Sequence, residues 1–457
     1  MPLDYAIHER TLTNGLRVVI QPDHRVPTVT VNIWVNVGSR HESPGRTGFA
    51  HLFEHLMFQG SANVASGEHF SALMAEGGRL NATTWFDRTN YFETVPTGAL
   101  ELALWLEADR HGHLLEAVNQ ANLDNQRDVV KEEKRQRYDN VPYGHALSDV
   151  YATIFPAGHP YHHPTIGSME DLDAALLLDV HTFYKQYYGP NNSVLTLVGD
   201  VTPEDGFALV KKHFGHLPRS ATDQRPRLPQ LPPLSHPVRL ERVEDVPNDR
   251  LYLAFRLPAE GGSEYLATSI ALDVLGGLTT SRLETRLVRG DEMANSVHTA
   301  AMGLIDGVSL GLVIVDIADG QDVAQVENAV VEELERLGAE GVTEAEMQAV
   351  LAQSERGWLT ALAANDDRAD IISHFATLHH DAQYINTFLD RLGEITATRV
   401  GEVARTWLRG HQRAVVTYRA RPATADRAGE PAEGALAAAG VAGDGVADVA
   451  TDTVEGR

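Results

Sequence analysis

Two histidines and a glutamate at helical spacing suggest metal chemistry near the start of the chain. Residues 47–62 read TGFAHLFEHLMFQGSA, in which His51 and His55 are four residues apart and Glu54 directly precedes the second histidine. On an α-helix, side chains at i and i+4 lie one above the other, about 6 Å apart at Cβ, so both imidazoles can reach one ion. A catalytic zinc site also needs a third protein ligand and an open position for water.

The apolar residues around this motif have the spacing of an amphipathic helix. They fall at i, i+3, i+4, i+7 and i+8, which is one helix face: Phe49, Leu52, Phe53, Leu56 and Met57. Thr47 is a candidate N-cap and Gly60 a candidate residue just beyond the C-terminus. The histidines then lie on the opposite face, which could also be an ordinary solvated face, since short motifs of this kind also arise by chance.

A third ligand is available in the helix-patterned stretch DNQRDVVKEEKRQRY, residues 124–138. Asp124 could cap this helix, and the adjacent acids Glu132 and Glu133 could provide a carboxylate. Neighbouring helical residues point about 100° apart, so only one of the two can face the ion. The residues themselves leave the choice open.

Composition restricts the possible chemistry. The chain has no cysteine, so a bound metal must be held by His, Asp or Glu. With 38 basic and 63 acidic residues, a net charge of −25 disfavours a nucleic-acid partner. No window approaches the roughly 18 apolar residues of a membrane span, and the N-terminus lacks the layout of a signal peptide. We therefore expect a cytoplasmic protein without a membrane partner.

The order of the expected elements predicts a duplicated architecture. A proline-rich linker, residues 225–237, separates an N-terminal domain (1–224) from a C-terminal domain (238–421). The fold class expected is α+β, with two similar halves, each a mainly antiparallel sheet packed with helices. The Ala-, Gly- and acid-rich residues 422–457 are expected to form a disordered tail.

Matching segments in the two halves support the prediction of a duplicated architecture. LRVVIQPD and VPTVTVNIWVNVG open the first half as strands, and VRLERVED and VPNDRLYLAFRLP open the second. Each pair precedes an expected helix, residues 49–58 and 264–275. Each half ends in an expected strand, residues 193–201 and 413–420.

Together, four segments resemble the pitrilysin family of zinc peptidases, in particular its small bacterial members related to the mitochondrial processing peptidase. They are HLFEH, GGRLNATTWFDRTNYFETVP, NQRDVVKEE and the run from FPAGHPYHHPTIG to YYGPNNSVLTLVGDV. The resemblance is strong over residues 12–217 and weak in the second half. It implies a zinc-dependent endopeptidase that acts on short or unfolded peptides.

The resemblance also implies roles for individual residues. Zinc would be bound by His51, His55 and the glutamate six residues after the arginine of NQRDVVKEE, which is Glu133, with Glu132 as the second choice. Glu54 would be the general base. Many relatives carry a second glutamate seven residues before the third ligand, where this chain has Gln126. A site of two histidines and one glutamate also accepts other divalent ions.

The stretch NATTWFD has the alternation of a half-exposed strand. By itself it predicts an ordinary edge strand. The resemblance implies that a substrate peptide adds to this edge as a further strand, which would make Asn81, Ala82 and Thr83 substrate-binding residues.

The second half lacks a His-Glu-His face, so one such zinc site per chain is expected. In active relatives, this half or a second subunit provides an arginine and a tyrosine that hold the substrate carbonyl. The corresponding run here is LVRGDEMANSV, with Arg289 and, at the tyrosine position, Asn295. This implies the metal-bearing subunit of a heterodimer whose partner provides the pair. A homodimer with a different donor, a non-catalytic assembly subunit and a zinc carrier are the alternatives.

Overall fold

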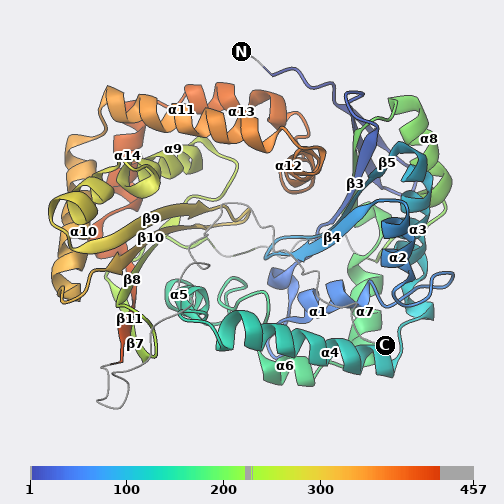
Figure 1. The fold of residues 1–457 in the computed structure, drawn as a ribbon, viewed down its shortest axis with the longest axis horizontal. Coiled ribbons are helices and arrows are strands. Elements are labelled where there is room, and N and C mark those ends of the chain that lie inside the picture. The colour runs from blue at the N-terminus through green and yellow to red at the C-terminus, as the bar shows by residue number, and fades with distance from the viewer. Residues whose placement is uncertain (1–2, 222–227, 229, 422–457) are drawn as a thin grey trace.

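The computed structural model describes residues 3–221, 228 and 230–421, which form two halves with one β-sheet each (Figure 1). The sequence-predicted tail, residues 422–457, lies outside the described residues, as do residues 225–227 and 229 of the expected linker. The proposed domain limits therefore stay a prediction.

The first sheet contains six strands in the order β1-β2-β6-β3-β5-β4. Their bounds are β1 (His8–Thr11), β2 (Arg17–Pro22), β3 (Thr28–Val35), β4 (Arg79–Thr84), β5 (Thr89–Pro96) and β6 (Ser193–Gly199). β2 and β6 pair in parallel, and the other neighbours pair antiparallel. β4 is the last strand in this order.

The second sheet repeats this plan with five strands in the order β7-β11-β8-β10-β9. Their bounds are β7 (Val238–Glu244), β8 (Arg250–Leu257), β9 (Ala294–Met302), β10 (Ser309–Ile317) and β11 (Ala414–Ala420). β7 and β11 are the parallel pair, as β2 and β6 are in the first sheet, and the remaining pairs are antiparallel. The predicted α+β fold of two similar halves is confirmed, and β9 corresponds to the edge strand β4.

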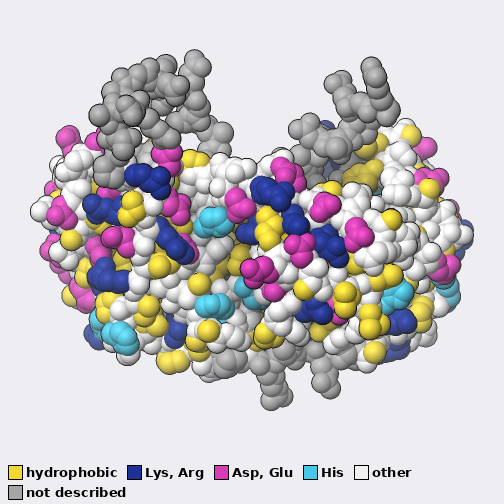
Figure 2. All heavy atoms as spheres, turned by 90° about the horizontal axis from the view of Figure 1, so that it is seen from below, with side chains coloured by type: hydrophobic (Ala, Val, Ile, Leu, Met, Phe, Trp, Pro, Cys, Tyr) yellow, Lys and Arg dark blue, Asp and Glu magenta, His cyan; other side chains and the backbone are white. Residues whose placement is uncertain are grey.

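The first half contributes eight helices in the described residues. They are α1 (Phe49–Leu56), α2 (Glu68–Ala75), α3 (Leu100–His113), α4 (Gln120–Lys134), α5 (Ala146–Ile154), α6 (Met169–Asp173), α7 (Leu177–Tyr187) and α8 (Pro203–Phe214). Of these, α5 packs on strands β7, β8 and β11 of the second sheet. α3 and α8 bury the apolar face of the sheet around residues such as Val31 and Leu104. On the face where α4 and α6 lie, acidic and basic side chains are interleaved (Figure 2).

The second half adds α9 (Ser263–Leu272), α10 (Val323–Glu340), α11 (Glu344–Ala361), α12 (Asn365–Leu378), α13 (Tyr384–Gly393) and α14 (Ala397–Trp407). Short 3₁₀ segments occur at Ser39–His41, Thr97–Ala99, Leu114–Glu116, Pro190–Asn192 and Gly410–Gln412, and π segments at Arg135–Asp139, Asp273–Gly277 and Glu284–Gly290. The helix predicted over residues 264–275 is thus an α-helix that continues as a π turn. None of the described helices is long and apolar enough to cross a membrane.

One helix of the second half packs on the sheet of the first. α12 lies against β3 and β6, on the side opposite α3 (Figure 1). Its fully buried Arg368 donates to Gln21 Oε1 (3.1 Å) and to Asp23 Oδ2 (2.5 Å). Asp370, also on α12, accepts from Trp34 Nε1 of β3 at 2.9 Å. The two halves therefore interlock through a polar contact that is buried on both sides.

Candidate metal centre

Helix α1 is held by its apolar face and by an acceptor side chain that shortly precedes the helix. Leu52, Phe53 and Leu56 are fully buried. The carboxylate of Glu42 accepts from the backbone N–H groups of Gly48 (3.0 Å) and Ala50 (2.7 Å), which are among the unpaired donors of the first turn. These contacts fix the helix axis, and with it the face that carries the histidines.

The sequence-predicted cap of this helix was wrong. The N-cap is Gly48, with φ of +84°, and a Cβ there would lie 2.5 Å from the Ile166 carbonyl oxygen. Thr47 instead donates its hydroxyl to Asp171 Oδ2 at 2.5 Å. The helix also ends at Leu56 rather than at Phe58. Only glycine fits this position without strain, because both the backbone angle and the free space exclude a side chain.

Helix α4 provides the third side chain. It begins earlier than predicted, because Asn119 caps it by accepting two backbone N–H groups of its first turn. Asp124, the expected cap, lies inside the helix and pairs with Arg127 at 2.8 Å. Arg127 also donates to the carbonyl oxygens of Leu172 (2.9 Å) and Ala175 (2.8 Å), which anchors α4 beside α6.

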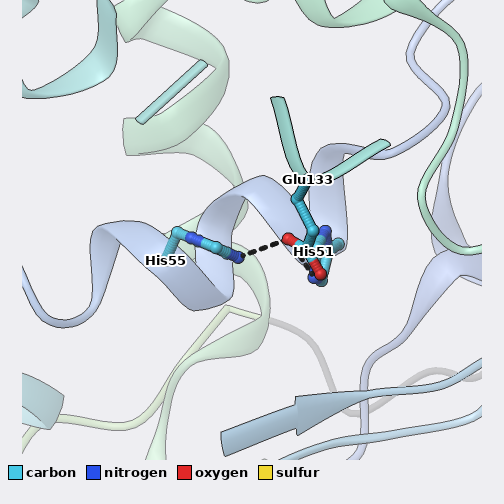
Figure 3. A group of neighbouring side chains, drawn as sticks. All are labelled: His51, His55 and Glu133. Atoms are coloured by element: carbon cyan, nitrogen blue, oxygen red, sulfur yellow. Dashed lines mark ion pairs between the residues drawn. The ribbon is translucent and has the colours of Figure 1, made fainter. Parts of the chain in front are cut away.

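The side chains of His51, His55 and Glu133 converge between α1 and α4 (Figure 3). Glu133 Oε2 lies 3.4 Å from His55 Nε2 and 3.7 Å from His51 Nε2. With zinc–ligand distances of about 2.0–2.2 Å, neighbouring ligand atoms of a tetrahedral site are about 3.3–3.6 Å apart. The separations in this α1–α4 cluster, one inside this range and one slightly above it, are therefore close to those of a zinc ligand set.

Glu132 points elsewhere. Its side chain is 54% exposed and pairs with Arg135 at 3.0 Å. Glu133 is 16% exposed and faces the histidines, while Arg137 Nη1 holds its second oxygen at 3.0 Å. Of the two candidate glutamates, the structure brings only Glu133 to the histidines.

Burial and mutual charge effects shift the pKa of each residue in the α1–α4 cluster. Burial and the neighbouring His55 lower the pKa of His51 to about 4. Burial alone would raise the pKa of Glu133, but His55 and His51 outweigh it and lower that pKa to about 2. Burial opposes the charged form of His55, yet Glu133 and Glu54 raise its pKa. The buried His55 Nε2 and His51 Nδ1 make no hydrogen bond among the described residues, so the cluster has unsatisfied nitrogen atoms.

Glu54 lies beside this cluster and is almost fully buried. Burial raises the pKa of its carboxyl group, against the opposing effects of His55 and Thr84. The Thr84 hydroxyl donates to Glu54 Oε2. Thr84 is the last residue of β4, so the edge strand ends at this carboxylate. Sequence reasoning missed Thr84, because no local spacing links residues thirty positions apart.

The position where relatives carry a second glutamate is filled by a buried carboxamide. Gln126 lies on α4 two turns before Glu133, and its side chain raises the pKa of His55 through a hydrogen bond. Gln126 therefore contacts the His55 imidazole in the place of a second acidic group.

The expected substrate-binding residues lie on β4 and are more buried than a half-exposed strand predicts. Asn81, Ala82 and Thr83 pair with β5, and β4 has no second neighbour among the described strands. Ala82 and Thr83 are buried. The Ala82 N–H is bonded to Asn81 Oδ1 at 2.8 Å, and Arg88 Nη1 donates to the Thr83 carbonyl oxygen at 3.1 Å.

The run expected to hold the carbonyl-binding pair lies at the corresponding edge of the second sheet. Arg289 is exposed in the π segment before β9. Asn295 is exposed near the start of β9, and its Nδ2 donates to the Ile317 carbonyl oxygen at 3.4 Å. Neither residue belongs to the α1–α4 cluster.

Comparisons with known proteins agree with this geometry. Residues 17–166 match the family described as insulinase (peptidase family M16), and residues 177–354 match the peptidase M16 inactive domain. The zinc protease PqqE of Helicobacter pylori is 29% identical over 409 residues, covering 89% of this chain and 91% of that protein. An uncharacterized zinc protease of Mycobacterium leprae is 31% identical over 402 residues, covering 87% of this chain and 88% of its own length.

A solved structure also shares the fold across almost the whole chain. The crystal structure of a protease from Helicobacter pylori is 27% identical, with a TM-score of 0.84, and the match covers 91% of this chain and 99% of that one. The likeness therefore includes both halves.

Proposed function

Because the chain belongs to the M16, or pitrilysin, family of peptidases, we propose that it is a zinc-dependent endopeptidase that hydrolyses short or unfolded peptides. The observation that carries this proposal is the convergence of His51, His55 and Glu133, with the buried carboxyl group of Glu54 beside them. Two histidines, one carboxylate and a neighbouring glutamate are the components of a hydrolytic metal site.

His51, His55 and Glu133 would hold the metal, and their unsatisfied buried nitrogens and ligand-like separations fit it. A bound zinc ion would supply Lewis acidity to a water molecule and to the scissile carbonyl group. Arg137, which holds the second oxygen of Glu133, keeps that carboxylate turned toward the histidines.

Glu54 moves the proton. Its carboxylate takes a proton from the water molecule that attacks the carbonyl carbon and then gives it to the leaving amine as the C–N bond breaks. A carboxyl group with a pKa raised by burial can both accept and return a proton near neutral pH. Thr84 fixes one carboxylate oxygen, so the other is free to face the water molecule.

The edge strand β4 would bind the substrate. A peptide that adds to this edge gains main-chain hydrogen bonds and is held in register by Asn81, Ala82 and Thr83. Because β4 ends at Thr84, a peptide in this position is directed to Glu54. The Ala82 N–H now bonded to Asn81 would have to exchange that contact for a substrate carbonyl group.

The chain would act as the metal-bearing subunit of a heterodimer. Asn295 stands where active relatives carry a tyrosine, and a lost donor to the developing oxyanion costs several kcal/mol of transition-state stabilisation, roughly 3–4. A partner of similar fold would provide the arginine and the tyrosine. The complete set of His51, Glu54, His55 and Glu133 favours this over a non-catalytic assembly subunit, which needs no general base.

The test is cleavage of a mixed pool of unstructured peptides by the purified chain, with zinc measured on the same sample. Cleavage that a chelator stops would support the peptidase and contradict the need for a different partner; the native mass would then identify a homodimer or a monomer. If the α1–α4 cluster binds one zinc ion but no peptide is cleaved, a second chain of this fold is added. Peptide cleavage by the mixture would then support the heterodimer. Absence of zinc from that cluster would overturn the proposal.

A further inference from the structure

A second group of two histidines and a glutamate lies at the junction of the two halves. Glu260, His374 and His379, here called the junction cluster, have ligand atoms within 4.8 Å of one another. Glu260 lies in the loop between β8 and α9, and its N–H is bonded to the Leu304 carbonyl oxygen at 3.0 Å. His374 is in the last turns of α12, and His379 directly follows that helix. These residues belong to neither α1 nor α4.

The distances in the junction cluster are longer than charge-assisted hydrogen bonds usually are and close to the separations of metal ligands. His374 Nε2 lies 3.2 Å from each carboxylate oxygen of Glu260, and His379 Nε2 lies 3.3 Å from Oε2. Charge-assisted N–H···O bonds are usually about 2.7–2.9 Å long. Ligand atoms around a tetrahedral zinc ion are about 3.3 Å apart or slightly more. Both imidazoles thus turn Nε2 toward one carboxylate, and a small outward movement of the side chains would admit a shared cation.

Two glycines provide the space in which the junction cluster sits. Gly261 has φ of +95°, and a Cβ there would lie 2.6 Å from His379 Nδ1. A Cβ on Gly303 would lie 2.6 Å from the carboxyl carbon of Glu260. Side chains at these positions would displace the ligand atoms. The backbone is therefore shaped to the histidine and to the carboxylate at two independent points.

An aromatic ring and two acidic residues surround His374. The Trp34 ring meets the His374 ring edge to face, at 5.5 Å between centroids. Glu260 and Asp370, one turn earlier on α12, place negative charge near His374, and Arg88 places positive charge there. If both histidines were protonated, two imidazolium rings would lie 5.6 Å apart and repel each other. A divalent cation bound to neutral imidazoles avoids that repulsion.

A third group of possible ligands offers a contrast. His69, Glu93 and Glu107 also come together, but Glu107 is already bonded to the buried guanidinium of Arg110, which would repel a cation. No such competing guanidinium is bonded to Glu260 among the described residues.

We propose that Glu260, His374 and His379 bind a second divalent cation of the zinc class, separate from the ion at the α1–α4 cluster. The fourth position would be taken by water. α12 is docked on the first sheet, whereas Glu260 extends from the second sheet. The bound cation therefore clamps the two halves together, and its contribution is to stability rather than to the hydrolytic step.

The test is the zinc content of the full chain after equilibrium dialysis at a fixed free zinc concentration. We expect two zinc ions per wild-type chain, one in the His51→Gln/His55→Gln variant, one in the His374→Gln/His379→Gln variant and none when all four histidines are replaced. His380→Gln, at the exposed neighbouring histidine, is the matched control and should keep both ions. A His51→Gln/His55→Gln variant that binds no zinc would overturn the proposal.

A second measurement covers the case in which replacing both junction histidines prevents folding. In the His51→Gln/His55→Gln background, zinc should raise the unfolding temperature, because an ion that binds only the folded chain stabilises it. Glu260→Gln in that background removes the charge but keeps the shape, and it should abolish the rise. An unchanged rise with Glu260→Gln, or no rise without it, would show that the junction cluster is an ion pair only.

Discussion

At the scale of single residues, replacing Glu54 tests proton transfer without disturbing metal binding. In Glu54→Gln the amide oxygen can still accept from Thr84, so the site should keep its shape and its zinc. The amide cannot take a proton, and kcat/KM on a susceptible peptide should fall by about 10²–10⁴. The measurement is kcat/KM together with zinc content. A variant that cleaves peptides at the wild-type rate would exclude Glu54 as the base.

The adjacent glutamates Glu132 and Glu133 of α4 allow a matched test of which one is the third metal ligand. Glu133→Gln should weaken zinc binding by more than the roughly 10–100-fold that loss of an outer supporting contact costs. Glu132→Gln should leave binding unchanged, since that side chain is 54% exposed and pairs with Arg135. Zinc titration of both variants checks this. Equal effects of the two changes would show that the orientation of α4 differs from the one described.

How far the sequence predicts this site depends on how local each contact is. His51, Glu54 and His55 follow from one helical period, so their common face was predictable. The choice of Glu133 over Glu132 depends on how α4 docks through Arg127, and the residues alone left it open. Thr84 approaches from β4 and has no sequence signal. The roles of these residues in zinc binding and catalysis stay predictions, whereas the family and the duplicated fold are confirmed.

At the scale of elements, the placement of His51 depends on an acceptor outside its helix. Glu42→Ala leaves the N–H groups of Gly48 and Ala50 without their partner, which should cost about 1–2 kcal/mol of unfolding free energy. Because Ala50 directly precedes His51, the looser first turn should also weaken zinc binding. Chemical denaturation and zinc titration measure the two effects.

The control for this prediction is another acceptor near a helix start. Glu68 at the start of α2 accepts from the Ala65 N–H at 2.8 Å and is exposed. Glu68→Ala should reduce stability slightly and leave zinc affinity unchanged. If both variants kept full zinc affinity, the first turn of α1 would not need Glu42 to position the histidine.

For helices and strands too, the sequence predicts the features that depend on local pattern and misses those that depend on distant contacts. Alternating and apolar runs predicted the strands β2, β3, β6, β7, β8 and β11, because burial of one face or both is encoded locally. The cap of α1 was misassigned, since a glutamate six residues before Gly48 replaces the expected Thr47. The position of α12 could not be predicted, because a helix encoded in the second half packs on the sheet of the first.

At the scale of the whole molecule, Asp23 makes the contact between the halves sensitive to acid. Hydrogen bonds from Arg25, with Arg368 adding its charge, lower the pKa of Asp23 to about 2. A carboxyl group whose pKa is lower in the folded chain stabilises it above the unfolded value of about 3.9, and that contribution is lost as the pH falls toward 2. The difference in unfolding free energy between the wild type and Asp23→Asn should therefore be largest above pH 4 and shrink toward pH 2. A constant difference over this range would contradict it.

Arg368 and Arg25 both bind the carboxylate of Asp23, one from a buried and one from an exposed position. Replacing each in turn distinguishes the contact between the halves from an ion pair at the surface. Arg368 is fully buried on α12, whereas the side chain of Arg25 is 71% exposed. Arg368→Met removes the charge that joins α12 to the first sheet and leaves Asp23 short of a buried partner, which should cost about 3–5 kcal/mol. Arg25→Met should cost less than about 1 kcal/mol, as exposed ion pairs do.

Denaturant unfolding followed by a probe in each half should show one transition in the wild type and in Arg25→Met. In Arg368→Met the second half should unfold first, because α12 no longer couples the stability of the second half to that of the first sheet. A single transition seen by both probes in Arg368→Met would show that other contacts couple the two halves.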